Sequence, residues 1–217
     1  MQRADIDPIA IAPLTPHLRD LARRGELRRY RKGTLLIQEG DFGQTLYIIL
    51  EGQVRAFATG DKGREITYGE YGAGEYMGEL SLDGGPRSAS VETLKASLCA
   101  VITRQTLQQF IADVPEFAFE LLAKVIRRAR HATTNAKQMA LLDVYGRLAL
   151  LLEGLARPRP DGTRLIEPCP TQDDMRKRLG CSREMISKLL KGLKQGGWVR
   201  DDGNKTLVLM KALPPGW

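Results

Sequence analysis

GELSLDGGPRSAS, residues 78–90, places a glycine and a carboxylate, Gly78 and Glu79, one short loop ahead of an arginine and a serine, Arg87 and Ser88. After Gly78 the chain can make a short helical turn whose free backbone N–H groups point at an anion. Arg87 would add two charge-assisted hydrogen bonds to the same phosphate. A carboxylate beside a phosphate requires a hydroxyl donor, so we expect Glu79 to accept from a ribose 2′-OH. The stretch predicts a site for a sugar phosphate.

Short apolar runs separated by turn signals flank this stretch, from Glu26 to Thr103. They are rich in β-branched and aromatic residues and read ELRRYR, TLLIQ, TLYIIL, QVRAFAT, REITYGEY, SASVETL and SLCAVIT. Glycine-containing turns such as EGD, GDKG and GAGE separate them. Seven or eight such strands predict a sandwich or barrel, with jelly rolls among the options. LTPHLRDLARRG, before them, predicts a short helix.

After Thr103 the pattern becomes helical. RQTLQQFIADV predicts one helix, and PEFAFELLAKVIRRARHATTNAKQMALLDV, starting at Pro115, predicts a much longer one. Along it, apolar residues recur at alternating spacings of four and three, which is typical of a coiled-coil seam. These residues are Ala118, Leu122, Val125, Ala129, Ala132, Ala136 and Met139. The stripe predicts pairing with a second copy of the chain, although the same spacing also suits packing on the chain's own sheet. Arg127, Arg128 and Arg130 flank it at positions expected to face solvent.

The last third of the chain has helix signals of a different kind. GRLALLLEGLA predicts a helix that stops at the turn-forming RPRPDG, and RLIEP predicts a strand. Thr171 is expected to cap a short helix that ends at Gly180, and Ser182 to cap a second helix closed by Gly196 and Gly197. WVRDD and TLVLM then predict a hairpin. This order is a winged helix-turn-helix pattern.

The helix after Ser182 has a polar face suited to duplex DNA. Arg183 can donate to both acceptors of guanine, and Glu184 can accept from the cytosine amino group. Residues 171–200 carry eight basic and three acidic residues, which indicates a surface that faces a polyanion. The candidate DNA-binding residues are Thr171, Arg176, Ser182, Arg183, Glu184, Ser187, Lys188 and Lys191. A dimer would present two such helices to a near-palindromic site.

Three motifs in this order resemble those of the bacterial catabolite activator (cyclic AMP receptor) and FNR superfamily. GEL followed by PRSAS is similar to the phosphate-binding cassette of cyclic-nucleotide-binding domains, and GCSREMISKLLKGL is similar to the family's helix-turn-helix. LLDVYGRLALLL is similar to its interdomain hinge. The resemblance covers roughly residues 14–212. It implies an α+β fold with an N-terminal β jelly roll, a long dimerisation helix and a C-terminal winged helix-turn-helix.

The resemblance also implies domain bounds and partners. Residues 1–114 would form an N-terminal helix and the cyclic-nucleotide-binding β-roll, 115–142 the dimerisation helix and 143–217 the DNA-binding domain. A homodimer would bind double-stranded DNA and reorient its DNA-binding domains when a ligand binds between the roll and the long helix. RNA polymerase would contact a loop around Arg157 to Thr163.

The same resemblance assigns the ligand contacts by position. Ligand-binding residues would be Gly78, Glu79, Leu80, Arg87 and Ser88, together with Thr133 and Thr134 of the long helix. Cyclic AMP is the first ligand expected. Where the family places a threonine and then a serine against the adenine, this chain has Ala132 and Thr133, and the loop between Glu79 and Arg87 is shorter. A missing partner for a buried amino group costs about 1–3 kcal/mol, so cyclic GMP, cyclic di-GMP and nucleotide-independent activity stay open.

Composition excludes several other classes. The chain is 42% hydrophobic and 27% charged, as in globular rather than disordered or membrane-embedded proteins. The acidic N-terminus argues against a signal peptide, so we expect a cytoplasmic protein with no membrane partner. Three widely spaced cysteines, Cys99, Cys169 and Cys181, predict small buried residues rather than disulfides or a metal site. His17 and His131 are expected on the surface, and the chain offers no convincing nucleophile and base for an enzyme.

Overall fold

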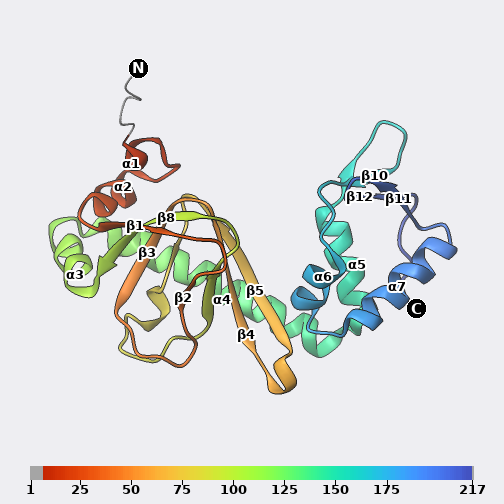
Figure 1. Ribbon diagram of the computed structural model, residues 1–217, viewed down its shortest axis with the longest axis horizontal. Coiled ribbons are helices and arrows are strands. Elements are labelled where there is room, and N and C mark those ends of the chain that lie inside the picture. Colours follow the sequence, from red (N-terminus) through yellow and green to blue (C-terminus); the bar gives the residue numbers. More distant parts are fainter. Residues whose placement is uncertain (1–6, 217) are drawn as a thin grey trace. The chain divides into compact units, whose positions relative to one another are not determined.

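The computed structural model describes residues 7–216 of the chain. Its contacts divide the chain into two compact units (Figure 1). Of these residues, 7–58 and 68–130 belong to the first unit, and 59–67 and 131–216 belong to the second. Each unit has a hydrophobic core of its own.

The first unit begins with two short helices and continues as eight strands. The helices are α1 (Pro8–Ile11) and α2 (Pro16–Arg23). The strands are β1 (Glu26–Tyr30), β2 (Leu35–Ile37), β3 (Thr45–Glu51), β4 (Gln53–Thr59), β5 (Glu65–Gly72), β6 (Tyr76–Met77), β7 (Ser90–Thr93) and β8 (Ser97–Thr103). They form two four-stranded sheets, in the orders β1-β8-β3-β6 and β2-β7-β4-β5. The two sheets confirm the predicted β-roll, and α1 and β6 add elements that the sequence did not predict.

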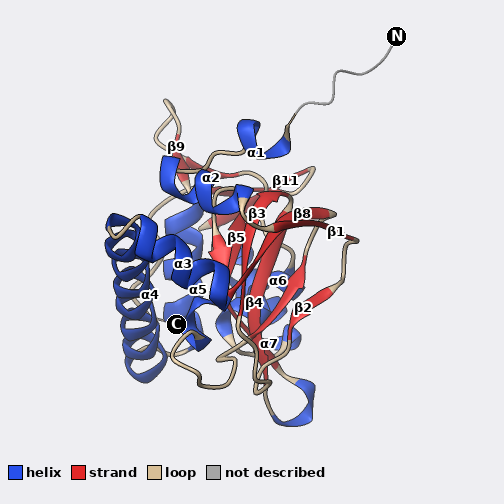
Figure 2. Cartoon of the chain, turned by 90° about the vertical axis from the view of Figure 1, so that its left-hand side faces the viewer, coloured by secondary structure: helices blue, strands red, loops and turns tan. Residues whose placement is uncertain are grey.

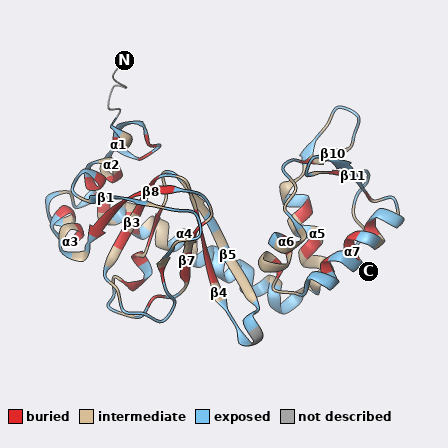
Figure 3. Cartoon of the chain, in the orientation of Figure 1, coloured by how far each residue is buried: buried red, intermediate tan, exposed pale blue. Residues whose placement is uncertain are grey.

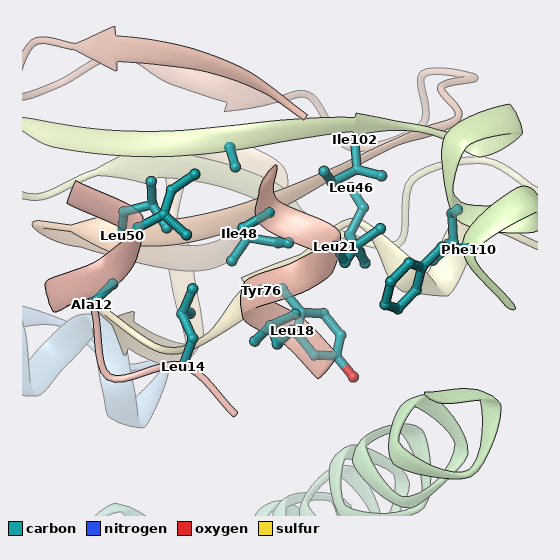
Figure 4. Close-up of a cluster of buried hydrophobic side chains, with 14 of the residues drawn as sticks. Ala12, Leu14, Leu18, Leu21, Leu46, Ile48, Leu50, Tyr76, Ile102 and Phe110 are labelled. Atoms are coloured by element: carbon teal, nitrogen blue, oxygen red, sulfur yellow. The ribbon is translucent and has the colours of Figure 1, made fainter. Parts of the chain in front are cut away.

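The alternation of side chains along β3 connects the two cores of the roll. Leu46, Ile48 and Leu50 belong to the cluster that also contains residues of the helices, whereas Ile49 belongs to the cluster between the two sheets. Successive side chains of a strand point to opposite faces, so β3 contributes side chains to both clusters. Figure 4 shows the first cluster, in which Leu21 of α2 packs against these residues. The helices of this unit therefore lie along one side of its strands (Figure 2).

Two helices, α3 (Arg104–Asp113) and α4 (Glu116–Leu141), follow β8. The 26-residue α4 confirms the long helix predicted after Pro115. Phe117 and Leu121 of α4 are buried in the core of the first unit, whereas Phe119 is 75% exposed. The residues of the predicted seam are half-exposed or exposed (Figure 3). In the single chain this stripe stays open, rather than being covered by the chain's own sheet.

The second unit contains the end of α4, three further helices and a four-stranded sheet. The helices are α5 (Val144–Leu155), α6 (Gln172–Leu179) and α7 (Arg183–Gln195), and the strands are β9 (Arg157–Pro158), β10 (Arg164–Ile166), β11 (Val199–Gly203) and β12 (Thr206–Leu209). The sheet has the order β11-β12-β10-β9. Leu148 and Leu152 of α5 pack with Met175 of α6 and Ile186 of α7 in its core. The segment between β4 and β5, with the 3-10 helix η1 (Asp61–Gly63), also belongs to this unit.

The predicted caps set the bounds of α6 and α7. Thr171 and Asp174 form a reciprocal capping box at the start of α6. Gly180 ends α6 with a φ of 64°, in the left-handed region that glycine favours. The Ser182 hydroxyl then accepts a 3.2 Å hydrogen bond from the backbone N–H of Met185 at the start of α7. With the β11–β12 hairpin, these helices form the predicted winged helix-turn-helix.

No helix within residues 7–216 combines the length and the apolar character that crossing a membrane requires. The same residues contain no group of three or more side chains placed to hold a metal ion.

Candidate functional site

The stretch 78–90 folds as the sequence predicts. Gly78 has a φ of 99°, and a single 3-10 turn, η2 (Glu79–Ser81), follows it. A Cβ at Gly78 would lie 2.5 Å from the carbonyl oxygen of Thr45 and 2.7 Å from Nη1 of Arg87. Both the left-handed backbone and the close approach therefore require glycine at this position.

Arg87 is only 6% exposed and is held in place by four hydrogen bonds to the protein. Nη1 donates to the Gly78 carbonyl at 2.9 Å and to the Ser81 hydroxyl at 2.8 Å. Nη2 donates to the Thr45 carbonyl at 2.9 Å and to the Thr45 hydroxyl at 3.0 Å. Burial lowers the pKa of Arg87, and Tyr47 and Glu79 oppose that effect, but a guanidinium stays charged in proteins. The result is a fixed buried cation whose Nε–H is not among these donors.

Glu79 is 5% exposed and forms an ion pair with Arg128 of α4. The Arg128 guanidinium donates to Oε1 of Glu79 and to the carbonyl oxygen of Tyr76. Oε2 of Glu79 is buried and has no hydrogen-bond partner among the described residues. The prediction that Arg128 faces solvent is wrong, because a buried carboxylate requires a nearby counter-charge. A buried acceptor oxygen without a donor fits a ligand hydroxyl.

Two tyrosine rings lie beside the Arg128 guanidinium. Its central carbon lies 5.0 Å from the ring centre of Tyr71 and 5.8 Å from that of Tyr76. The Tyr76 side chain is buried, and its hydroxyl has no hydrogen-bond partner among the described residues. Burial, followed by the Glu79 carboxylate, raises the pKa of Tyr76, so the phenol stays neutral. Glu79, Arg128 and the two tyrosines thus form one cluster of contacting side chains.

The sequence did not identify Thr45, Ser81 or Arg128. Thr45 lies on β3, far from the cassette in sequence, and no local pattern connects it with Arg87. A signal for Arg128 does exist, because Phe117, Leu121, Lys124 and Arg128 recur at spacings of four, three and four. These residues share one face of α4, and the face begins with the two residues that are buried against the roll.

The remaining predicted ligand residues lie at the surface. Leu80 is half-exposed and Ser88 is exposed, while Gly78, Glu79 and Arg87 come together around η2. Thr133 and Thr134 are exposed on the part of α4 that belongs to the second unit. The structure therefore brings the three central residues of the cassette together and leaves the others on exposed surfaces.

The polar face of α7 is exposed, as the sequence predicts. Arg183, Glu184, Ser187, Lys188 and Lys191 are solvent-accessible on the helix surface, opposite a buried apolar stripe. That stripe consists of Ile186, Leu189, Leu190 and Leu193. Hydrogen bonds at the N-terminus of α7 lower the pKa of the Glu184 carboxyl, which keeps it ionised as an acceptor. This helix can present three cations and a carboxylate to an elongated polyanion.

Other candidate DNA-binding residues are held by local contacts. The Thr171 hydroxyl donates to Asp174 at 2.7 Å within the capping box, and Ser182 caps α7. Nε of Arg176 lies 2.6 Å from the Asp173 carboxylate, in a half-buried pair. These three residues position the helices, and their side chains are less free than those on the face of α7.

The histidines and cysteines differ in part from expectation. His17 is half-buried rather than exposed, and its ring contacts Glu120 of α4. His131 is exposed, as expected. Cys99 is fully buried, and burial raises the pKa of its thiol to about 11. Cys169 and Cys181 are only half-buried because they lie at the edge of the second core.

Known proteins match this architecture over nearly its whole length. The model of the family "Cyclic nucleotide-binding domain" matches residues 27–114. The "CRP-like cAMP-activated global transcriptional regulator" of Mycobacterium tuberculosis is 32% identical over 207 residues, which cover 94% of this chain and 89% of the relative. The "cAMP-activated global transcriptional regulator CRP" of Haemophilus influenzae is 32% identical over 193 residues, which cover 86% and 84% of the two chains.

A solved structure shares the fold. It is the c-di-GMP responsive global regulator CLP of Xanthomonas campestris, with a TM-score of 0.75 and 28% sequence identity. The match covers 90% of this chain and 98% of that chain. It therefore extends over both units.

Proposed function

This chain belongs to the CRP/FNR family of DNA-binding transcription regulators, and from that membership we propose that it is a cytoplasmic homodimer controlled by a 3′,5′-cyclic nucleotide. Its relatives are regulators rather than enzymes. The observation that carries the ligand assignment is the pair of buried charges in the cassette. Glu79 and Arg87 lie around one 3-10 turn, and one oxygen of Glu79 lacks a donor.

The chemistry of a cyclic nucleotide complements these two side chains. Its phosphate carries one negative charge, for which the fixed Arg87 supplies a cation and an Nε–H donor. Its ribose has a 2′-OH that can donate to Oε2 of Glu79. We assign Leu80 and Ser88 to the rim of this site, and Thr133 and Thr134 to contacts with the base.

The exposed stripe of α4 supports a dimer. Leu122 and Met139 of the stripe, and Phe119 and Ile126 beside it, are large apolar side chains that the single chain leaves accessible. Each would be removed from water in a paired helix, with a gain of roughly 25 cal/mol per Å² of apolar surface buried. The small alanines at 129, 132 and 136 suit a close approach of two helices.

A dimer would present two α7 helices to one duplex. Arg183, Glu184 and Lys188 would read base edges in the major groove of a near-palindromic site. The assigned backbone contacts come from Thr171, Arg176, Ser182, Ser187 and Lys191. We propose RNA polymerase as the protein partner, with contacts to the turn at residues 157–163.

A second effector class, cyclic di-GMP, is favoured by one specific feature. Ala132 has no hydroxyl at a position where family members offer one to the adenine. The relative described as a c-di-GMP responsive regulator is 28% identical to this chain. We retain cyclic AMP as the first assignment and cyclic di-GMP as the alternative.

Calorimetric titration of the purified protein with cyclic AMP, cyclic GMP and cyclic di-GMP tests the assignment. We expect cyclic AMP to bind and Arg87→Leu to abolish that binding, while circular dichroism shows a folded domain. Glu79→Gln, which keeps the side-chain shape, serves as a second variant, and it should weaken binding without unfolding the roll. Wild-type affinity in both variants would show that the cassette does not bind the nucleotide.

A further inference from the structure

Three buried polar atoms beneath the first half of α4 have no hydrogen-bond partner among the described residues. They are the Tyr76 hydroxyl, Oε2 of Glu79 and Nε of Arg128. Buried polar groups in native proteins nearly always have partners, so each such atom calls for an explanation. The other two unpaired atoms of the described chain, Nε of Arg19 on α2 and Nε of Arg147 on α5, are isolated cases on separate elements.

The three atoms belong to residues that contact one another. The Arg128 guanidinium bonds to Oε1 of Glu79 and to the backbone carbonyl of Tyr76, and it lies 5.8 Å from the Tyr76 ring centre. The Glu79 carboxylate is the strongest charged influence on the Tyr76 phenol, where it adds to burial in raising its pKa. Tyr76 is only 6% exposed, and Figure 4 shows its hydroxyl oxygen at the outer edge of the hydrophobic cluster. The three unpaired atoms therefore belong to one cluster of contacting side chains.

The donor and acceptor pattern of this cluster suits a hydroxyl group. Oε2 of the Glu79 carboxylate accepts hydrogen bonds, Nε of Arg128 only donates, and a phenol hydroxyl does both. A carbonyl group cannot donate to the carboxylate, and an ammonium group cannot accept from the guanidinium. A hydroxyl donates one hydrogen bond and accepts up to two, so it has the donor and acceptor capacity that the three atoms together require. In a 3′,5′-cyclic nucleotide the only free ribose hydroxyl is the 2′-OH.

We propose that Tyr76 is a specificity-determining residue, whose hydroxyl acts with Glu79 and Arg128 to select nucleotides that carry a ribose 2′-hydroxyl over 2′-deoxy nucleotides. The inference rests on the proposed function, because it assigns a further contact within the same ligand site. It goes beyond that function because it gives a role to the Tyr76 hydroxyl, which makes no hydrogen bond within the described residues. Packing of the ring requires only a phenylalanine.

Titration of the full-length protein with cyclic AMP and with 2′-deoxy cyclic AMP tests this role. Tyr76→Phe removes only the hydroxyl, and we expect it to weaken cyclic AMP binding about 3- to 10-fold, the usual range for one hydrogen bond. Affinity for the 2′-deoxy analogue should stay unchanged, so the preference for the 2′-hydroxyl shrinks by the same factor. Tyr68→Phe on β5, where the ring is 49% exposed, is the matched control and should leave the preference intact.

Thermal unfolding separates this role from a structural one. Without ligand, Tyr76→Phe should unfold at the wild-type temperature or above it, since the variant removes an unpaired buried hydroxyl. Equal weakening of both nucleotides, or an unchanged preference in Tyr76→Phe, would overturn the inference while the proposed function stands. Failure of the wild-type protein to bind any 3′,5′-cyclic nucleotide would overturn both.

Discussion

Arg128 of α4 forms an ion pair with Glu79 of the cassette, and their side chains are 14% and 1% exposed. This pair joins the long helix directly to the turn that holds the candidate ligand site. A group that binds at Glu79 must either share this carboxylate with Arg128 or replace it. Ligand binding at Glu79 would therefore change the contacts of Arg128 on α4, the helix that carries the exposed apolar stripe. This ion pair is the contact through which the proposed regulation would act.

Removal of Arg128 should destabilise the first unit. Arg128→Leu leaves the Glu79 carboxylate buried without its counter-charge, and we expect a loss of about 3–5 kcal/mol in the free energy of unfolding. Urea unfolding measures this loss. Arg127→Leu, an exposed neighbour, should change stability by no more than about 0.5 kcal/mol. Similar losses in the two variants would mean that the ion pair contributes nothing specific.

The orientation of Arg87 should depend on Thr45. Thr45→Val removes the hydroxyl that accepts from Nη2 while keeping the shape of the side chain. We expect weaker cyclic nucleotide binding by about 1 kcal/mol, the usual contribution of one hydrogen bond. Thr45→Ser keeps the hydroxyl and should restore most of the affinity in the same calorimetric titration. Equal affinities for the valine and serine variants would contradict this role.

Base readout should depend on Arg183. Arg183→Ala is expected to reduce the affinity for a selected site by about 1–3 kcal/mol, whereas non-specific binding at low salt persists. Electrophoretic mobility shifts with specific and scrambled duplexes measure both. Lys95→Ala, an exposed basic residue of the first unit, should leave the two affinities unchanged. A parallel loss of specific and non-specific binding would show that Arg183 contacts phosphates rather than bases.

The stripe on α4 should control oligomeric state. Leu122→Glu places a charge within this stripe and is expected to give a monomer in light scattering coupled to size exclusion. Lys137→Glu, exposed on the same helix but outside the stripe, should leave a dimer. A dimer in both variants would require a different interface.

Cys99 should make the stability of the roll sensitive to alkaline pH. Burial raises the pKa of its thiol to about 11, above the value of about 8.5 for an unfolded chain. The neutral thiol is favoured in the folded state, so its contribution to the free energy of unfolding is fully present below about pH 8.5 and decreases as the pH rises towards 11.

In the native protein at pH 8, Cys99 should react with a thiol reagent only after unfolding. Labelling as fast as at Cys169 and Cys181 would contradict its place in the core.

The sequence predicts the elements of this fold better than the contacts within its site. Alternating runs identify seven strands, and Thr171, Gly180 and Ser182 carry local cap and turn signals that the structure reproduces. The missed elements, α1, β6 and β9, are two to four residues long, which is too short for a periodic pattern of apolar residues to be recognised. The sequence gives the charges of the cassette, but not the anchoring of Arg87 by Thr45 and Ser81.

Those anchors depend on which segments the sheets bring together, and this information is not local. Thr45 meets Arg87 across 42 positions, and Arg128 meets Glu79 across 49. His17 was expected at the surface, but it contacts Glu120 because α2 and α4 pack on the same side of the roll. Each of these pairs joins residues whose neighbours in sequence give no sign of the partner.

Occupancy of the Glu79–Arg87 site should change the affinity of α7 for DNA. The most direct test is the affinity of the full-length protein for its selected palindromic duplex, measured with and without saturating cyclic AMP, cyclic GMP or cyclic di-GMP. We predict that one of these nucleotides changes the affinity at least about 5-fold, and that Arg87→Leu abolishes the change. The same DNA affinity at every concentration of all three nucleotides would contradict the account.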